Sequence, residues 1–293
     1  MAYKSGFVNI IGNPNVGKST LMNTLVGERL SIITSKAQTT RHRIMGIVNG
    51  ADFQIVYSDT PGILKPNYKL QESMMRFVRG ALKDADIILY VTDTVEVVGE
   101  AADEMIARVA ASGIRTIVVI NKIDLTTPER LDELVAAWRG RLPEADVVPV
   151  SARENFNVGG LFDLILKHLP EGAPYYEGDA LSDRTMRFFA SEIIREKILL
   201  FYDKEIPYSV EIEIDEYREE PTIDRISATI YVARDSQKGI LIGHKGVMLK
   251  RVGTAAREEL EQFLGKKVFL QLHVKVNDNW RNSERQLKRF GYE

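Results

Sequence analysis

The chain has 293 residues, 44% hydrophobic and 27% charged, which excludes a largely disordered or fibrous protein. It contains no cysteine, and this excludes disulfides, cysteine nucleophiles and thiolate metal sites. Lysine and arginine number 39 against 41 aspartates and glutamates, so the net charge of −2 gives no sign by itself of an unusually acidic or basic partner.

The length predicts two domains, at roughly 150 residues for each. No apolar run approaches the roughly 20 residues of a membrane helix, and the first residues lack the apolar region of a signal peptide. We therefore expect a cytoplasmic protein. Without any heptad or oligomerisation stripe, a monomer is the default expectation.

Apolar segments alternate with helical patterns through the first domain. Buried strands are predicted at 6–11, 53–57, 87–91, 116–120 and 147–150, and helices at 69–82, 101–112, 128–141 and 160–169. This alternation predicts an α/β fold with a mostly parallel sheet and helices on both faces. Residues 46–48 could add one antiparallel strand by pairing with 53–57 across Asn49-Gly50, a dipeptide typical of hairpins.

The pattern changes after Pro170. We expect a first domain at 1–171, a linker at 172–180 and a second, α+β domain at 181–293. The elements predicted for the second domain are a helix from an N-cap at Ser182 to about Tyr202, strands at 208–214 and 223–232, two helical segments broken at Gly243-His244-Lys245-Gly246, a strand at 268–274 and a basic C-terminal helix.

A phosphate-binding loop is predicted between the first strand and the helix after it. The residues that fit the pattern are Gly12-Asn13-Pro14-Asn15-Val16-Gly17-Lys18-Ser19, followed by Thr20. Its glycines let successive N–H groups point at phosphate oxygens, and the helix adds its positive N-terminal end. Lys18 would reach the β- and γ-phosphates, and the Ser19 hydroxyl would bind Mg²⁺.

Three further motifs each follow directly after a predicted strand. They are Asp59-Thr60-Pro61-Gly62, Asn121-Lys122-Ile123-Asp124 and Ser151-Ala152-Arg153. The carboxyl ends of parallel strands are where open α/β sheets bind ligands. Asp59 would hold Mg²⁺ through water, and the Gly62 N–H can meet the γ-phosphate.

The second and third of these motifs indicate guanine. The Asp124 carboxylate can accept hydrogen bonds from guanine N1–H and the exocyclic amine, whereas adenine would leave it buried and unpaired. The Lys122 stem can lie over the base, and a backbone N–H at Ser151–Arg153 could meet guanine O6. An ATP-dependent kinase is therefore excluded, and the first domain is predicted to bind GTP.

The second domain contains a short turn that suits nucleic acid. Ile240-Leu241-Ile242 leads into Gly243-His244-Lys245-Gly246, and Lys250 and Arg251 follow. Two glycines allow an RNA backbone to approach closely, Lys245 can meet phosphate, and Ile240 and Ile242 would form part of an apolar groove wall. The segment 234–289 holds 13 basic and 6 acidic residues, a net of +7. That excess is either a phosphate-facing surface or a solvated face.

The first 170 residues resemble the Era/EngA/TrmE branch of translation-factor-related GTPases. Asn15, Thr39-Thr40-Arg41 and Asp59-Thr60-Pro61-Gly62 carry this resemblance. It implies that Thr40, or failing that Thr39, closes over Mg²⁺ and the γ-phosphate. Ile63 stands where Ras-like GTPases place a water-orienting Gln, which implies slow hydrolysis. Asn15 resembles an asparagine that coordinates K⁺, so it is either a K⁺ ligand or a loop-capping residue. Hydrolysis is expected to involve Asn15, Lys18, Thr40 and Gly62.

The order of elements in the second domain resembles the KH fold of type II, the bacterial type. A GTPase of this branch joined to one C-terminal KH domain resembles the bacterial Era family over the whole chain. The resemblance implies binding to the single-stranded 3′ end of 16S rRNA, a role in assembly of the small (30S) ribosomal subunit and a peripheral contact with the inner membrane. The residues themselves indicate GTP and a short single-stranded RNA.

Two alternatives stay open. The chain could be a signalling or membrane-associated GTPase whose C-terminal domain binds protein. The basic C-terminal helix, with Arg281, Arg285, Lys288 and Arg289, could contact RNA or could be an amphipathic helix that packs Trp280, Leu287 and Phe290.

No pair among the four histidines has metal-ligand spacing.

Overall fold

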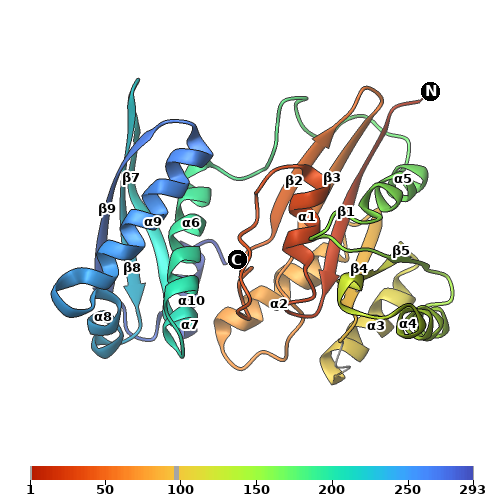
Figure 1. Ribbon diagram of the computed structural model, residues 1–293, viewed down its shortest axis with the longest axis horizontal. Helices are drawn as coiled ribbons and strands as arrows, with labels where there is room; N and C mark the ends of the chain where they lie inside the picture. The colour runs from red at the N-terminus through yellow and green to blue at the C-terminus, as the bar shows by residue number, and fades with distance from the viewer. Residues whose placement is uncertain (1, 96–98, 293) are drawn as a thin grey trace. The chain divides into compact units, whose positions relative to one another are not determined.

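The computed structural model describes residues 2–95 and 99–292 (Figure 1). It divides into two compact units: residues up to Asn67 with Gln71–Asp183, and Tyr68–Leu70 with the residues from Arg184 onward. Among the described residues, no helix has both the length and the apolar composition needed to cross a membrane.

A six-stranded sheet forms the centre of the first unit, in the order β2-β3-β1-β4-β5-β6 (Figure 1). The strands are β1 (Lys4–Gly12), β2 (Ile44–Asn49), β3 (Phe53–Asp59), β4 (Ile87–Asp93), β5 (Arg115–Asn121) and β6 (Asp146–Pro149). All neighbours pair in parallel except β2, which runs antiparallel to β3 as the Asn49-Gly50 turn predicts. Asp59 pairs with Ile10 and Asn121 pairs with Asp93, so the motif-bearing ends of these strands reach one edge of the sheet.

Helices complete the first unit. They are α1 (Lys18–Val26), α2 (Lys69–Ala81), α3 (Glu100–Ser112), α4 (Pro128–Arg141) and α5 (Val158–His168), with a short 3₁₀ turn at Ile123–Leu125. One core cluster joins the sheet to α2, α3 and α4; its buried members include Ile88, Val118, Val78, Met105 and Trp138. This core fixes the strand ends that carry the motifs.

The second unit has an α+β fold, in which helices pack against a three-stranded sheet, β7-β8-β9 (Figure 1). Its elements are α6 (Met186–Phe201), α7 (Ile206–Ser209), β7 (Glu211–Glu219), β8 (Ile223–Val232), α8 (Asp235–Ile242), α9 (Val247–Leu264), β9 (Lys267–Val276) and α10 (Glu284–Arg289), with 3₁₀ turns at His244–Gly246 and Trp280–Asn282. β7 pairs with β8 antiparallel, and β8 pairs with β9 in parallel. Helices α6, α8 and α9 bury Ile194, Leu241 and Val252 against this sheet.

Two predicted boundaries in the second unit are wrong. Helix α6 begins at Met186 with Thr185 at its N-cap, and Ser182 lies outside the helix, where its hydroxyl donates to the Met45 carbonyl at 2.5 Å. Tyr208 lies in the short helix α7, where Pro207 occupies the first turn, and the strand starts only at Glu211. The predicted basic C-terminal helix is present and is six residues long.

The segment predicted as a linker lies against the sheet of the first unit. The side chain of Gln54, which is fully buried, donates to the Tyr176 carbonyl at 2.9 Å and accepts from the Tyr176 N–H at 3.0 Å. The Ile47 N–H of β2 donates to the Leu181 carbonyl at 2.9 Å. Residues 172–183 therefore cover part of β2, which is an edge strand with backbone groups in need of partners.

Candidate nucleotide site and RNA-binding loop

The predicted phosphate loop connects β1 to α1. Gly17, at the N-cap of α1, has φ 93°, and a Cβ there would lie 2.3 Å from Asn121 Nδ2. Only glycine fits this position, because any side chain would meet both strain and a clash. Lys18 is buried, and its ammonium donates to the carbonyls of Gly12 and Asn13 at 3.0 and 2.7 Å. The loop thus holds a cation where the N–H groups of Gly17–Ser19 begin a helix.

The charge state of Lys18 depends on its burial. Desolvation lowers the pKa of the Lys18 ammonium to about 8, and the nearby Asp59 carboxylate opposes this shift. Burial also raises the pKa of the Asp59 carboxyl, against the charge of Lys18 and hydroxyl donors that include Ser19. Both groups therefore lie in a dry site whose charges an anion and a divalent cation would stabilise.

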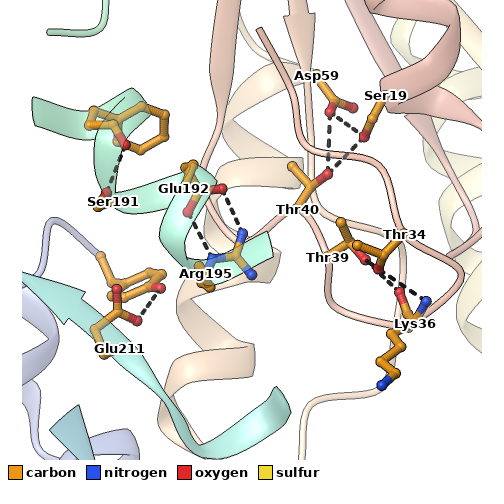
Figure 2. A network of polar contacts seen from close by, with 12 residues as sticks. Ser19, Thr34, Lys36, Thr39, Thr40, Asp59, Ser191, Glu192, Arg195 and Glu211 are labelled. Atoms are coloured by element: carbon orange, nitrogen blue, oxygen red, sulfur yellow. Dashed lines mark hydrogen bonds and ion pairs between the residues drawn. The ribbon is translucent and has the colours of Figure 1, made fainter. Parts of the chain in front are cut away.

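Three oxygen-bearing side chains meet beside the phosphate loop (Figure 2). Ser19 Oγ donates to Asp59 Oδ2 at 2.7 Å and lies 2.9 Å from Thr40 Oγ1, which is 3.3 Å from the same carboxylate oxygen. The other oxygen, Asp59 Oδ1, is buried and has no hydrogen-bond partner of normal geometry among the described residues. A carboxylate and two hydroxyls are oxygen donors of the kind that Mg²⁺ accepts, so this set fits the metal.

The two adjacent threonines differ in orientation (Figure 2). Thr39 Oγ1 lies 2.6 Å from Thr34 Oγ1 and donates to the Lys36 carbonyl at 2.6 Å, so it serves its own loop. Thr40, which is 8% exposed, faces Ser19 and Asp59 instead. Of the two residues that the sequence left open, Thr40 is the one near the predicted metal site.

The motif after β3 packs onto the phosphate loop. Thr60 Oγ1 donates to the Ile10 carbonyl at 2.7 Å, and a Cβ on Gly62 would lie 2.8 Å from Pro14 Cα. The Ile63 N–H donates to the Gly12 carbonyl at 3.1 Å, and the Ile63 side chain is buried. An aliphatic residue here offers no group that could orient a water molecule.

The base end of the site is cross-linked by side chains. Asn121 Nδ2 donates to the Val16 carbonyl at 2.9 Å, and Asn121 Oδ1 accepts from the Ala152 N–H at 3.0 Å. The Ser151 hydroxyl donates to Asp124 Oδ1 at 2.5 Å, which fixes the carboxylate predicted to read guanine. The motifs after β5 and β6 are therefore joined to each other and to the phosphate loop.

Lys122 pairs with Asp93, a residue that no sequence motif had indicated. Its Nζ donates to the Asn15 carbonyl at 2.5 Å and to Asp93 Oδ2 at 2.6 Å. Asp93 ends β4, so the same strand-end rule that found Asp59 could have found it. The side-chain amide of Asn15 donates to the Ser35 carbonyl at 3.2 Å, which links the phosphate loop to the Thr40 loop.

These residues surround a cavity of about 450 Å³. Its lining includes residues 14, 15 and 17–20 of the phosphate loop, residues 32–35 and 38–40, Gly62, Lys122 and Arg153. All four predicted nucleotide motifs are thus brought together at one edge of the sheet.

Within residues 2–95 and 99–292, no group of three His, Cys, Asp or Glu side chains is placed to hold a metal.

The Gly-x-x-Gly turn is the exposed feature of the second unit. Gly243 and Gly246 have φ 71° and 78°, and His244 and Lys245 between them are exposed. Ile240 is 50% exposed just before the turn, and Ile242 is half-buried. Lys250 and Arg251 are exposed on α9, with the Arg251 guanidinium 4.3 Å from the centre of the Phe201 ring.

The basic C-terminal segment is held largely by packing. Trp280 is fully buried, its indole N–H donates to the Ser209 carbonyl at 3.1 Å, and its ring meets Phe290 edge-on at 5.7 Å. Arg289 makes hydrogen bonds of 3.0 and 2.6 Å to both oxygens of Glu213. The amphipathic alternative accounts for these contacts.

Comparison with known proteins identifies the family. Residues 7–122 match the family described as 50S ribosome-binding GTPase, and residues 205–281 match the KH domain. GTPase Era of Geobacter metallireducens is 44% identical over 292 residues, which are 99% of this chain and 98% of that protein. The chain belongs to the Era family of GTPases. GTPase Era of Syntrophus aciditrophicus is also similar, at 45% identity over 99% of this chain and 95% of its own length.

Solved Era structures share the fold of the whole chain. One is a crystal structure of Era in complex with MgGDPNP and nucleotides 1506–1542 of 16S ribosomal RNA, with a TM-score of 0.95 and 39% identity over 99% of each chain. A structure of a point variant of Aquifex aeolicus Era bound to GDP and AlF₄⁻ matches with the same TM-score and identity. The family assignment confirms a P-loop GTPase followed by a KH domain, and the protein is a GTPase.

Proposed function

We propose that this protein is a GTP-controlled RNA-binding factor that recognises the single-stranded 3′ end of 16S rRNA during assembly of the 30S subunit. The observation that carries the proposal is the presence, in one chain, of a nucleotide cavity of about 450 Å³ and an exposed Gly-x-x-Gly turn. A relative of 39% identity over 99% of the chain was solved with a GTP analogue and with that RNA.

The site residues take the roles that their chemistry supports. Gly12–Thr20 cradle the phosphates, Ser19, Thr40 and Asp59 hold Mg²⁺, and Thr60–Gly62 face the γ-phosphate. Asn121, Lys122, Asp124 and Ser151–Arg153 bind guanine. Bound Mg²⁺ would neutralise charge on the β- and γ-phosphates. Ile240, Ile242, the turn Gly243–Gly246, Lys250 and Arg251 contact RNA. In this proposal the domains span residues 1–171 and 181–293, and the protein acts as a monomer in the cytoplasm.

Hydrolysis by the isolated protein is expected to be slow, because Ile63 cannot orient the attacking water. Asn15 is proposed to help bind a K⁺ ion that supplies positive charge near the phosphates. Hydrolysis should then run faster in K⁺ than in Na⁺ at equal ionic strength. Equal rates in the two salts would leave Asn15 only its hydrogen bond to Ser35.

The proposal is tested with a fluorescent single-stranded RNA copied from the 16S 3′ end. Its affinity is measured at fixed salt with GDPNP, with GDP and without nucleotide, because salt alone changes such affinities widely. Tighter binding with GDPNP than with GDP supports a GTP-controlled RNA switch. Equal binding in all states would keep the RNA role and remove the control by GTP. No binding would favour the alternative, a GTPase whose second domain binds protein.

The ribosomal partner is tested by sedimentation with purified 30S and 50S subunits. We expect co-sedimentation with 30S particles, increased by GDPNP and competed by the free RNA. Selective binding to 50S subunits would contradict the proposed assembly role, even though the family matched by residues 7–122 is described as 50S ribosome-binding. A scrambled RNA of equal length is the control for the competition.

A further inference from the structure

Arg43 lies in a polar cluster that no nucleotide motif includes. Its Nε donates to Ser58 Oγ at 2.6 Å, and Nη1 and Nη2 donate to the two oxygens of Asp84 at 2.6 and 2.9 Å. Nη2 also donates to Asn9 Oδ1 at 3.1 Å. Asn9 Nδ2 in turn donates to Asp84 Oδ1 at 2.8 Å and to the Ala81 carbonyl at 2.5 Å.

The cluster is built to hold an arginine in one place. The Arg43 side chain is 12% exposed, and Asn9 and Ser58 are fully buried. Its partners come from β1, from β3 and from the turn after α2. A guanidinium fits this bidentate geometry, whereas a lysine ammonium has a single nitrogen and cannot reach all three partners.

This fixed point lies close in the chain to Thr40. Three peptide steps separate the two residues, a reach of about 10 Å at most. Ile44, the next residue, opens β2 and pairs with Asp59, the carboxylate that Thr40 also approaches (Figure 2). The segment from Thr40 to Arg43 is therefore a short tether between the predicted metal site and the cluster.

We propose that Arg43 is a positioning residue for the GTP-bound state, because its cluster fixes the end of the Thr40 loop and so sets where the Thr40 hydroxyl can lie. This inference rests on the proposed role of Thr40 at Mg²⁺ and the γ-phosphate. GDP has no γ-phosphate, so the cluster should affect GTP binding and leave GDP binding largely unchanged. Arg43 touches neither nucleotide nor metal in this account.

The test compares affinities for GDPNP and GDP, with excess Mg²⁺, in wild type, Arg43→Lys, Asp84→Asn and Thr40→Ala. We expect Arg43→Lys and Asp84→Asn to weaken GDPNP binding at least five-fold and to change GDP binding less than two-fold. The Mg²⁺ concentration needed for half-maximal GDPNP binding should rise in parallel. Arg141→Lys, which keeps a surface ion pair with Asp103 (2.7 Å in the wild type), is the matched control and should change neither affinity.

Two outcomes would overturn the inference: equal loss of GDP and GDPNP affinity, which indicates a general structural role, or no loss in either variant. Asp84→Asn keeps Arg43 and its bonds to Ser58 and Asn9, so it carries the test if Arg43→Lys does not fold. If Arg43 acts through Thr40, Arg43→Lys should add less than two-fold to the Thr40→Ala defect, and an additive loss would contradict this. Unchanged GDPNP binding in Thr40→Ala would instead refute the proposed role of Thr40.

Discussion

The two glycine-containing loops of this protein both precede a helix, but they are held differently. In the phosphate loop, a Cβ on Gly17 would lie 2.3 Å from the side chain of Asn121, and Lys18 is buried with its ammonium on two carbonyls. In the Gly-x-x-Gly turn, a Cβ on Gly243 would lie 2.8 Å from Met248 Cγ, but a Cβ on Gly246 would meet nothing within 4 Å, and Lys245 is exposed. The first loop is fixed from several sides, and the second is open to solvent at Lys245 and Gly246.

A fixed loop and an exposed turn give different kinds of ligand specificity. A loop whose donors are fixed before binding loses little freedom when a phosphate arrives, so it can support tight and selective binding. An exposed turn offers close approach and charge, and its affinity depends more on salt and on the partner's own flexibility. Substitutions in the nucleotide site should therefore have larger and more specific effects than those at the RNA turn.

The largest effect is expected for Asp124→Asn. The change replaces one carboxylate oxygen, an acceptor, with an amide NH₂, a donor. One of the two guanine N–H donors, at N1 or at the exocyclic amine, would then lose its acceptor in the site. We expect GDP affinity to fall by about 10³-fold or more, and xanthosine diphosphate, which carries a carbonyl in place of the amine, to bind better than GDP. Competition between the two nucleotides, measured by calorimetry, checks this.

Asp132→Asn is the matched control, since Asp132 is exposed on α4. It should leave both nucleotide affinities unchanged. If Asp124→Asn keeps its preference for GDP, the assignment of Asp124 to the guanine edge is wrong.

A smaller but still large effect is expected at the RNA turn. Changing Gly243 and Gly246 to Asp adds two negative charges and two side chains where the backbone has φ 71° and 78°. RNA affinity should fall by roughly 100-fold through repulsion and loss of close approach, while GTP hydrolysis without RNA stays at the wild-type rate. Anisotropy with the labelled RNA and phosphate release measure the two activities.

Gly265→Asp places one of the same charges at the other end of α9, where glycine ends the helix and a Cβ would meet nothing within 4 Å. Its RNA affinity should stay within two-fold of wild type. Survival of RNA binding in the double Asp variant would show that the turn is not the RNA site.

The two units also differ in how much of their structure the sequence predicts. In the first unit, Pro128–Arg141 is helical as predicted, because Thr127 caps it and Pro128 occupies its first turn. The four nucleotide motifs follow strand ends, and strand ends of a parallel sheet gather at one edge. Local pattern and site chemistry therefore agree at each motif.

Contacts between residues far apart in sequence could not be predicted in this way. Ser182 and Thr185 are both good N-cap residues by type, and the sequence does not show that Ser182 lies outside the helix with its hydroxyl on the distant Met45 carbonyl. The linker shows no periodicity that would reveal its hydrogen bonds to Gln54. Arg43 and Asp84 are 41 residues apart, and neither lies in a motif, so their pairing could be found only from coordinates.

Nucleotide binding at the phosphate loop should depend on pH, because Lys18 is buried there. Burial lowers the pKa of Lys18 to about 8, and bound phosphates would raise it again. Well below pH 8, Lys18 is charged with and without nucleotide, so affinity is constant. Above pH 8, binding must take up a proton, and the dissociation constant for GDP should rise about five-fold from pH 8 to 9.

Calorimetry at pH 8.5 in two buffers of different ionisation enthalpy measures this proton uptake directly. RNA binding at the Gly-x-x-Gly turn, which does not involve Lys18, should show no corresponding loss between pH 8 and 9. A constant GDP affinity up to pH 9 would mean that Lys18 is not the group that titrates.

The smallest effects separate two cations near the RNA turn. Lys245 is exposed between the glycines, whereas the Arg251 guanidinium lies 4.3 Å from the centre of the Phe201 ring. Lys245→Ala should reduce the salt dependence of RNA binding by about 0.7 in the slope of log K against log salt, the value for one contact with single-stranded RNA. Arg251→Ala should lower stability by about 0.5–1 kcal/mol through the lost cation–π contact, and it should reduce the slope by less than Lys245→Ala does, because the guanidinium is held over the Phe201 ring. An unchanged slope in Arg251→Ala would remove Arg251 from the proposed RNA surface, and an equal fall in both variants would mean that the guanidinium leaves Phe201 to bind phosphate.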